Sequence, residues 1–151
     1  MNIVAAVVGS ETIILVEGQV QADQTVAIVN DETFNLEAGA RHKAYAVMQQ
    51  RVRDRLKSGV DKVVVKASSG GQFAAKTTVL HAAELRGVLL SSIPDNVELI
   101  QRQKKAISRA HSKNLDDYVK DDSFFVKHFI GTLRKGSREA AFLILYEGVI
   151  V

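Results

Sequence analysis

The chain has 151 residues, of which 46% are hydrophobic and 25% charged, the usual balance of one globular domain with a real core. It contains no cysteine, which excludes disulfides, thiolate zinc sites and a cysteine nucleophile. The net charge is only +3 but uneven: residues 1–40 carry six acidic and no basic side chains, and residues 101–138 carry ten lysines and arginines against four aspartates. Such asymmetry is typical of a surface that contacts phosphates, and equally of two halves that neutralise each other.

The chain carries no obvious targeting or membrane segment. Its N-terminus lacks the positive stretch of a signal peptide and soon becomes polar. No apolar run approaches the roughly 20 residues of a membrane helix. A single proline and the lack of any long linker predict one domain over residues 1–151, and we expect a cytoplasmic protein.

The first 36 residues have the patterns of β-strands: residues 3–9 are a β-rich apolar run, and residues 24–36 alternate around Val26, Ile28 and Phe34. Short turns separate three such runs, and short connections favour antiparallel pairing. We therefore predict a three-stranded meander made of Ile3–Gly9, Thr12–Val20 and Gln24–Leu36.

Beyond residue 40 the periodicity becomes helical. In Ala40–Lys57 the apolar side chains fall near one face, while Arg51, Arg53 and Arg55 lie mostly off it. The rest of the chain predicts strand Val60–Ala67, helix Phe73–Ser91, strand Val97–Gln101, and helices Lys104–His111, Leu115–Phe129 and Ser137–Tyr146. Aspartates in the last part are interpreted as helix caps and solvent-facing groups: Asp116, Asp117, Asp121 and Asp122.

This order of elements predicts the fold class. Three antiparallel strands followed by two strands that helices connect give an α/β domain with a five-stranded mixed sheet and helices on both faces. That is the RNase H-like architecture.

Four segments carry a family resemblance. Ile3–Ser10 is IVAAVVGS, Ala83–Leu90 is AELRGVLL, Val97–Ile107 contains Gln103-Lys104-Lys105, and Arg138–Leu145 is REAAFLIL. They resemble, in turn, the first strand with its Gly-Ser turn, the helix behind the fourth strand, the fifth strand with its basic segment, and the final helix of the RuvC-type Holliday junction resolvases and related short bacterial RNase H-like proteins.

The resemblance implies a metal site that this sequence lacks. Members of that superfamily hold two divalent ions with carboxylates on the first strand, the fourth strand and the last helix, and so cleave phosphodiesters. Val7, Lys66 and Phe142 stand at three of these positions, Glu139 is the one remaining acid, and Glu11 lies just past the first turn. We therefore predict a catalytically degenerate domain without a metal site, and a nuclease with a non-standard site is the less favoured alternative.

The expected function is nucleic-acid binding or regulation. Lys66 either holds a phosphate or has a structural role, such as pairing with Glu139. Two basic clusters should meet on the face of the former active site and line a groove for DNA or RNA. The predicted contacts are Lys66, Arg102, Lys104, Lys105, Arg109, Lys113, Arg134, Lys135 and Arg138. The rival is a protein-interaction module such as a homodimer, with these cations paired to the aspartates.

A second phosphate motif is weaker. Gly70–Thr77, GGQFAAKT, follows a strand and opens a helix as a P-loop does, but Ala75 replaces the required glycine. It predicts an anion-binding loop formed by Ser69, Gly70, Gly71 and Lys76, with a nucleotide-binding protein as a less favoured alternative. The four histidines lack metal-ligand spacing, and we expect no cofactor. Aromatic side chains near Lys120 and Lys127 are interpreted as core rather than as base-stacking groups: Tyr118, Phe124, Phe125 and Phe129.

Overall fold

The structure is a computed structural model that describes residues 1–67, 76–109 and 114–150. Its strands are β1 (Asn2–Val8), β2 (Thr12–Val20), β3 (Val26–Asn35), β4 (Lys62–Ala67), β5 (Glu98–Gln103) and β6 (Phe129–Ile130). Its α-helices are α1 (Arg41–Leu56), α2 (Thr77–Ser91), α3 (Lys104–Arg109), α4 (Leu115–Val119), α5 (Asp122–His128) and α6 (Arg138–Leu145). A 3₁₀ turn, η1 (Lys135–Ser137), precedes α6, and a π-helical turn, η2 (Tyr146–Ile150), follows it. Within the described ranges, no helix combines the length and apolarity needed to cross a bilayer.

The sheet has the order β5-β4-β1-β2-β3-β6. β1, β2 and β3 form the predicted antiparallel meander, and β4 and β5 then add in parallel to β1. The prediction of five strands is short by one. After α5 the chain runs beside β3 for two residues, and Phe129 and Ile130 pair with Val26 and Ala27. Two residues are too few to show a period-2 pattern, so this strand had no signal in the sequence.

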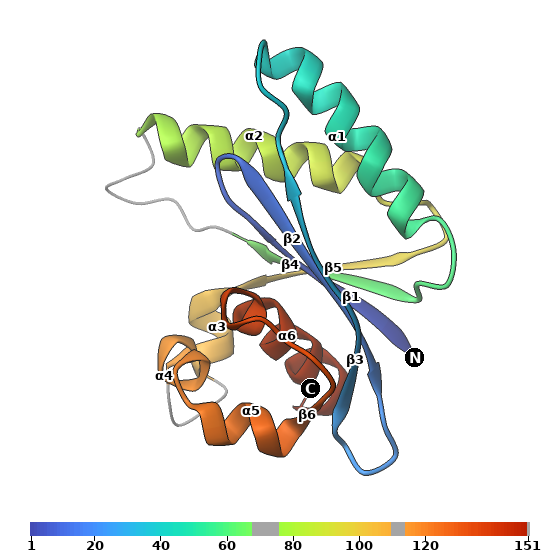
Figure 1. Ribbon diagram of the computed structural model, residues 1–151, viewed down its shortest axis with the longest axis vertical. Coiled ribbons are helices and arrows are strands. Elements are labelled where there is room, and N and C mark those ends of the chain that lie inside the picture. The colour runs from blue at the N-terminus through green and yellow to red at the C-terminus, as the bar shows by residue number, and fades with distance from the viewer. Residues whose placement is uncertain (68–75, 110–113, 151) are drawn as a thin grey trace.

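Helices cover both faces of the sheet, as predicted (Figure 1). On one face α1 and α2 bury Met48, Val52, Leu56, Leu85 and Leu89 against the strands. On the other face α6 is buried along nearly its whole length, from Ala140 to Leu145. The predicted aromatic core lies on this second face, where Phe125 and Phe129 are buried and Tyr118 and Phe124 pack against them.

Helix α6 can approach the sheet closely because β2 carries a glycine there. A Cβ atom on Gly18 would lie 2.6 Å from a methyl carbon of Val26 and 3.3 Å from one of Ile144 in α6. The register between β2 and β3 shifts at Glu17/Gly18, as a β-bulge would require. The close packing of α6 on the sheet therefore depends on Gly18 having no side chain.

The predicted helix Leu115–Phe129 is two helices. The break falls at Lys120–Asp121, where the Asp121 carboxylate accepts a hydrogen bond from the Phe124 backbone N–H and begins α5. An aspartate two to three residues before a free N–H competes with helix continuation, which is why it caps. The prediction of one helix was wrong, but its interpretation of Asp121 as a cap is confirmed.

Asp31 in β3 fixes the turn that leads into α6. Its carboxylate accepts hydrogen bonds from the Arg134 backbone N–H at 2.9 Å, the Arg134 guanidinium at 2.7 Å and the Ser137 hydroxyl at 2.5 Å. Burial alone would raise the pKa of Asp31, but these donors together lower it below its ordinary value. Asp31 thereby links the central part of β3 to the first turn before α6.

This link predicts a specific acid sensitivity. Because the folded-state pKa of Asp31 lies below the unfolded value, its stabilisation is present near neutral pH and is lost as the pH falls through the folded pKa. We expect Asp31→Asn to cost about 1–3 kcal/mol at pH 7, and the difference from the parent protein to shrink in acid. Urea unfolding at several pH values measures it. The control is Asp95→Asn, an exposed turn residue, and an equal cost at all pH values would contradict the role of the Asp31 charge.

Candidate functional site

Three of the positions at which the resemblance predicts carboxylates, Val7, Lys66 and Phe142, lie near one another in the fold. β1 and β4 run parallel with Ala6 beside Val65, so Val7 and Lys66, one residue further along, are neighbours. Helix α6 lies over this part of the sheet, and Val7 packs against the cluster that contains Phe142. Val7, Lys66 and Phe142 therefore lie on the same side of the sheet, close to the first turn of α6.

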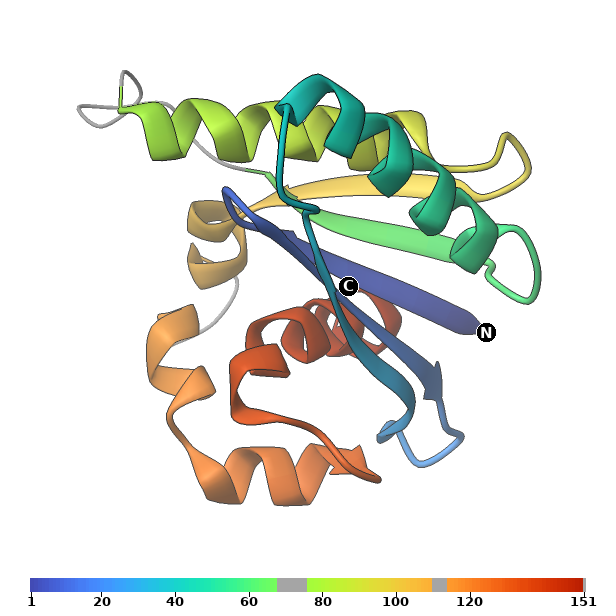
Figure 2. The ribbon, with the colours of Figure 1, turned by 45° about the horizontal axis from the view of Figure 1, so that its top comes forward.

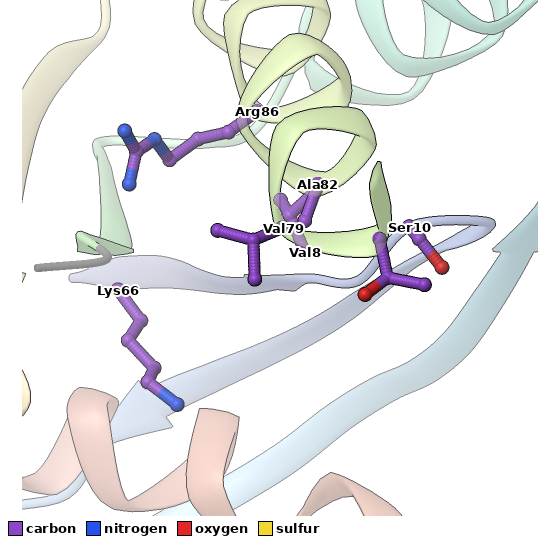
Figure 3. Close-up of a pocket in the computed structure, with 7 residues that line it drawn as sticks. Val8, Ser10, Lys66, Val79, Ala82 and Arg86 are labelled. Carbon is purple, nitrogen blue, oxygen red and sulfur yellow. The ribbon is translucent and has the colours of Figure 1, made fainter. Parts of the chain in front are cut away.

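At the centre of this site is an ion pair. The ammonium of Lys66 contacts the Oε1 atom of Glu139 in the first turn of α6, and both side chains are about one quarter exposed. That oxygen is itself buried, and among the described residues no group other than the Lys66 ammonium donates to it. Figure 3 shows the Lys66 side chain pointing away from α2 and Arg86. Of the two interpretations of Lys66, pairing with Glu139 is the one that the structure contains.

A second ion pair lies beside the first, and sequence reasoning missed it. Arg102 is the neighbour of Lys66 across the β4–β5 ladder. Its guanidinium binds Glu147 in η2, whose side chain is only 2% exposed, and lies 5.8 Å from the centre of the Tyr146 ring. The hydrogen bond to Glu147 raises the pKa of Arg102 above its ordinary value. The sequence did offer one signal for this pair: Glu147 is a charged residue directly after a long apolar segment.

The residues of this site do not fit a divalent metal ion. Such ions require oxygen ligands, and neither Val7 nor Phe142 has one. Glu139 does, but the ammonium of Lys66 already neutralises it and would repel a metal ion. In the described part of the chain, no three histidine, aspartate or glutamate side chains lie close enough together to hold a metal.

Most of the predicted nucleic-acid contacts have acidic partners within the protein. Lys104 binds Asp116 at 2.7 Å, Arg134 binds Asp31 at 2.7 Å and Arg138 binds Asp122 at 2.8 Å. Lys104 and Arg138 lower the pKa values of Asp116 and Asp122 by these hydrogen bonds. Lys105 and Lys135 are exposed. The side chain of Arg109 and all of Lys113 lie outside the described residues.

The two basic segments border the same face, but α4 lies between them. Lys104 contacts Asp116 on one side of α4, and Arg138 donates to the Val119 carbonyl at its other end, 3.1 Å away. Lys66 and Lys120 add to the positive potential around Asp116. Arg134 is further away, at β3. The charge distribution is therefore a patch around Lys66, Lys104, Lys105 and Lys120, with Arg134 apart from it.

A cavity of about 270 Å³ opens at the carboxyl ends of β1 and β4, on the side of α2. Its described lining is Val8, Ser10, Lys66, Thr78, Val79, Ala82 and Arg86 (Figure 3). Of the predicted anion loop, Ser69, Gly70 and Gly71 lie outside the described residues. Lys76 stands at the start of α2 and is exposed. That loop stays a prediction.

Comparison with known proteins identifies the fold. No family model matches the chain, and no curated protein does. Among solved structures, Thermus thermophilus RuvC in complex with a Holliday junction substrate matches with a TM-score of 0.74 and 11% identity, over 97% of this chain and 95% of that one. The yeast mitochondrial Holliday junction resolvase Ydc2 matches with a TM-score of 0.68 and 13% identity, over 95% of this chain and 76% of that one.

These matches span nearly the whole chain, so the domain has an RNase H-like fold. Within that class its form is that of the RuvC resolvases, as the resemblance predicted. Identities of 11% and 13% define the fold alone.

Proposed function

We propose that this protein is a RuvC-like nucleic-acid-binding module that does not cleave its ligand by metal-dependent hydrolysis. The observation that carries the proposal is the Lys66–Glu139 ion pair, with Val7 and Phe142 beside it, at the place where a two-metal site would require carboxylates. In this proposal the ammonium of Lys66 takes the place that a metal ion would have in a nuclease of this fold.

The choice of ligand rests on fold and charge. One of the solved structures with this fold is RuvC bound to a Holliday junction, so branched DNA is the first ligand to test. The patch of Lys66, Lys104, Lys105 and Lys120 borders the same face of the sheet, as the effect of three of these lysines on Asp116 indicates. Such a patch contacts phosphates rather than bases, so we propose binding by shape and backbone charge.

The first test measures binding and cleavage together. Four-way junction DNA, duplex DNA, RNA–DNA hybrid and single-stranded RNA are titrated with the protein at several salt concentrations, with magnesium or manganese present. We expect the protein to bind the junction, and the logarithm of its binding constant to fall linearly with the logarithm of the salt concentration. We expect no cleavage product. Absence of binding at low salt would contradict the proposal. Cleavage that disappears in Glu139→Ala would show that other carboxylates complete a site.

The second test locates the surface. We expect Lys104→Glu with Lys105→Glu to lower the affinity by at least tenfold, because each reversal replaces a phosphate contact with repulsion. The matched control is Lys43→Glu with Lys57→Glu, two exposed lysines of α1 and its C-cap, on the other face of the sheet. Equal losses from both pairs would mean diffuse attraction and no defined site. Circular dichroism checks that both variants fold.

A further inference from the structure

A short acidic segment borders the patch of Lys66, Lys104, Lys105 and Lys120. This segment is α4 with the first turn of α5, and both helices lie beside α6 (Figure 1). In Figure 2 the orange helices α4 and α5 curve around the red helix α6. Lys104 begins α3 at the end of β5, and Arg138 begins α6. The acidic segment therefore lies between the two basic parts of the chain.

Apolar contacts hold α4 in this position. Leu115 is buried in the cluster around α6, and the rings of Tyr118 and Phe142 lie 5.1 Å apart, centre to centre. At the far end of α4, Arg138 donates to the Val119 carbonyl at 3.1 Å, and the arginine side chain is only 13% exposed. The position of α4 thus depends on its apolar face, and its acidic face is available for other contacts.

The acidic face presents one carboxylate to the patch. Asp116 accepts a hydrogen bond from the Lys104 ammonium at 2.7 Å. This bond lowers the pKa of Asp116, and the charges of Lys66 and Lys120 lower it further. The carboxylate therefore interacts with three of the four lysines of the patch, and it binds Lys104 directly.

The contact between Lys104 and Asp116 is open to exchange. Their side chains are 45% and 64% exposed, respectively. Exposed ion pairs contribute little to stability, and a phosphate oxygen accepts a hydrogen bond from a lysine ammonium as a carboxylate oxygen does. A nucleic-acid backbone that reaches Lys104 has to displace Asp116 or lie beside its negative charge. In both cases the carboxylate weakens binding.

We propose that Asp116 is an internal competitor of the phosphate backbone, which occupies Lys104 in the free protein and releases this lysine to a phosphate when nucleic acid binds. This role depends on the nucleic-acid binding proposed above and adds a regulatory element to the same surface. Its consequence is that the affinity stays below the value that the four lysines alone would give.

Removal of the charge tests this role. The affinity for four-way junction DNA is measured at moderate ionic strength for the parent protein, Asp116→Asn and Asp117→Asn. Asp117 is the matched control, because it is the adjacent exposed residue of α4 and forms no ion pair with the described side chains. We expect Asp116→Asn to bind about threefold to tenfold more tightly than the parent protein. Asp117→Asn changes the net charge equally and should gain less than about twofold, since salt screens exposed charges.

A double-mutant cycle tests whether Asp116 acts through Lys104. The pair is absent in Lys104→Gln, so the addition of Asp116→Asn to this variant should bring no more than the gain of Asp117→Asn. An equal gain with and without Lys104 would overturn the inference, because Asp116 would then act through net charge alone. Circular dichroism checks that each variant folds.

The outcomes separate this inference from the proposed function. If the parent protein binds the junction and Asp116→Asn binds it with the same affinity, the proposed function stands and the role of Asp116 is overturned. If neither protein binds the junction even at low salt, the proposed function and the role of Asp116 are both wrong.

Discussion

Arg55→Met is expected to destabilise the folded protein by about 3 kcal/mol, because it leaves one buried carboxylate, Glu17, and one half-buried carboxylate, Glu32, without their cation. Arg55 in α1 donates to Glu17 of β2 and to Glu32 of β3, both at 2.6 Å. The Glu17 side chain is only 10% exposed and otherwise accepts a hydrogen bond from Asn2. Both carboxylates raise the pKa of Arg55, although burial opposes them. Chemical denaturation at neutral pH measures the loss.

Two controls separate this network from ordinary surface charge. Arg53→Met on the same helix removes an exposed arginine whose hydrogen-bond partner in the described part of the chain is the Ser91 carbonyl, and it should cost less than about 1 kcal/mol. Adding Glu17→Met to Arg55→Met should recover much of the stability, since replacing both members of a buried pair by apolar side chains is often neutral. If Arg55→Met costs no more than Arg53→Met, the network contributes nothing beyond a surface pair.

Arg55 also marks what sequence patterns could not provide. The periodicity of α1 places Arg51, Arg53 and Arg55 away from the apolar face. It does not show which of these arginines contacts acidic residues of the sheet. Only the packing of α1 across β2 and β3 brings Glu17 and Glu32 to Arg55. The same holds for Arg102 and Glu147, which are 45 residues apart and meet because the chain end returns beneath β5.

Patterns of hydrophobicity were sufficient for the main elements. Each of the first five strands and both long helices were predicted within a few residues, since their apolar side chains repeat with clear periods. The Lys66–Glu139 contact was one of the two interpretations of Lys66 that the sequence left open. The sequence did not predict which acid pairs with Lys104, Arg134 or Arg138. Long charged side chains can reach several acids, and the fold decides which of these lie nearby.

The last prediction restores the missing ligands. Val7→Asp with Lys66→Glu would add carboxylates from β1 and β4 beside Glu139 of α6, which makes three in all. Without metal the like charges should destabilise the protein. Manganese should bind the variant and not the parent protein, as isothermal titration would show. A ligand at a hundred times its Kd stabilises a protein by about 2.7 kcal/mol, which corresponds to a rise in Tm of roughly 5–10 °C for a domain of this size.

Matched variants make this result specific. Val7→Asn with Lys66→Gln has similar shape without the charges, and it should bind no manganese. Adding Glu139→Gln to Val7→Asp and Lys66→Glu should abolish most of the gain, since two carboxylates remain where three were needed. A folded Val7→Asp, Lys66→Glu protein that ignores manganese would mean that Glu139 does not point into a metal-sized space. In that case the Lys66–Glu139 pair is a structural contact of this fold with no relation to a former metal site.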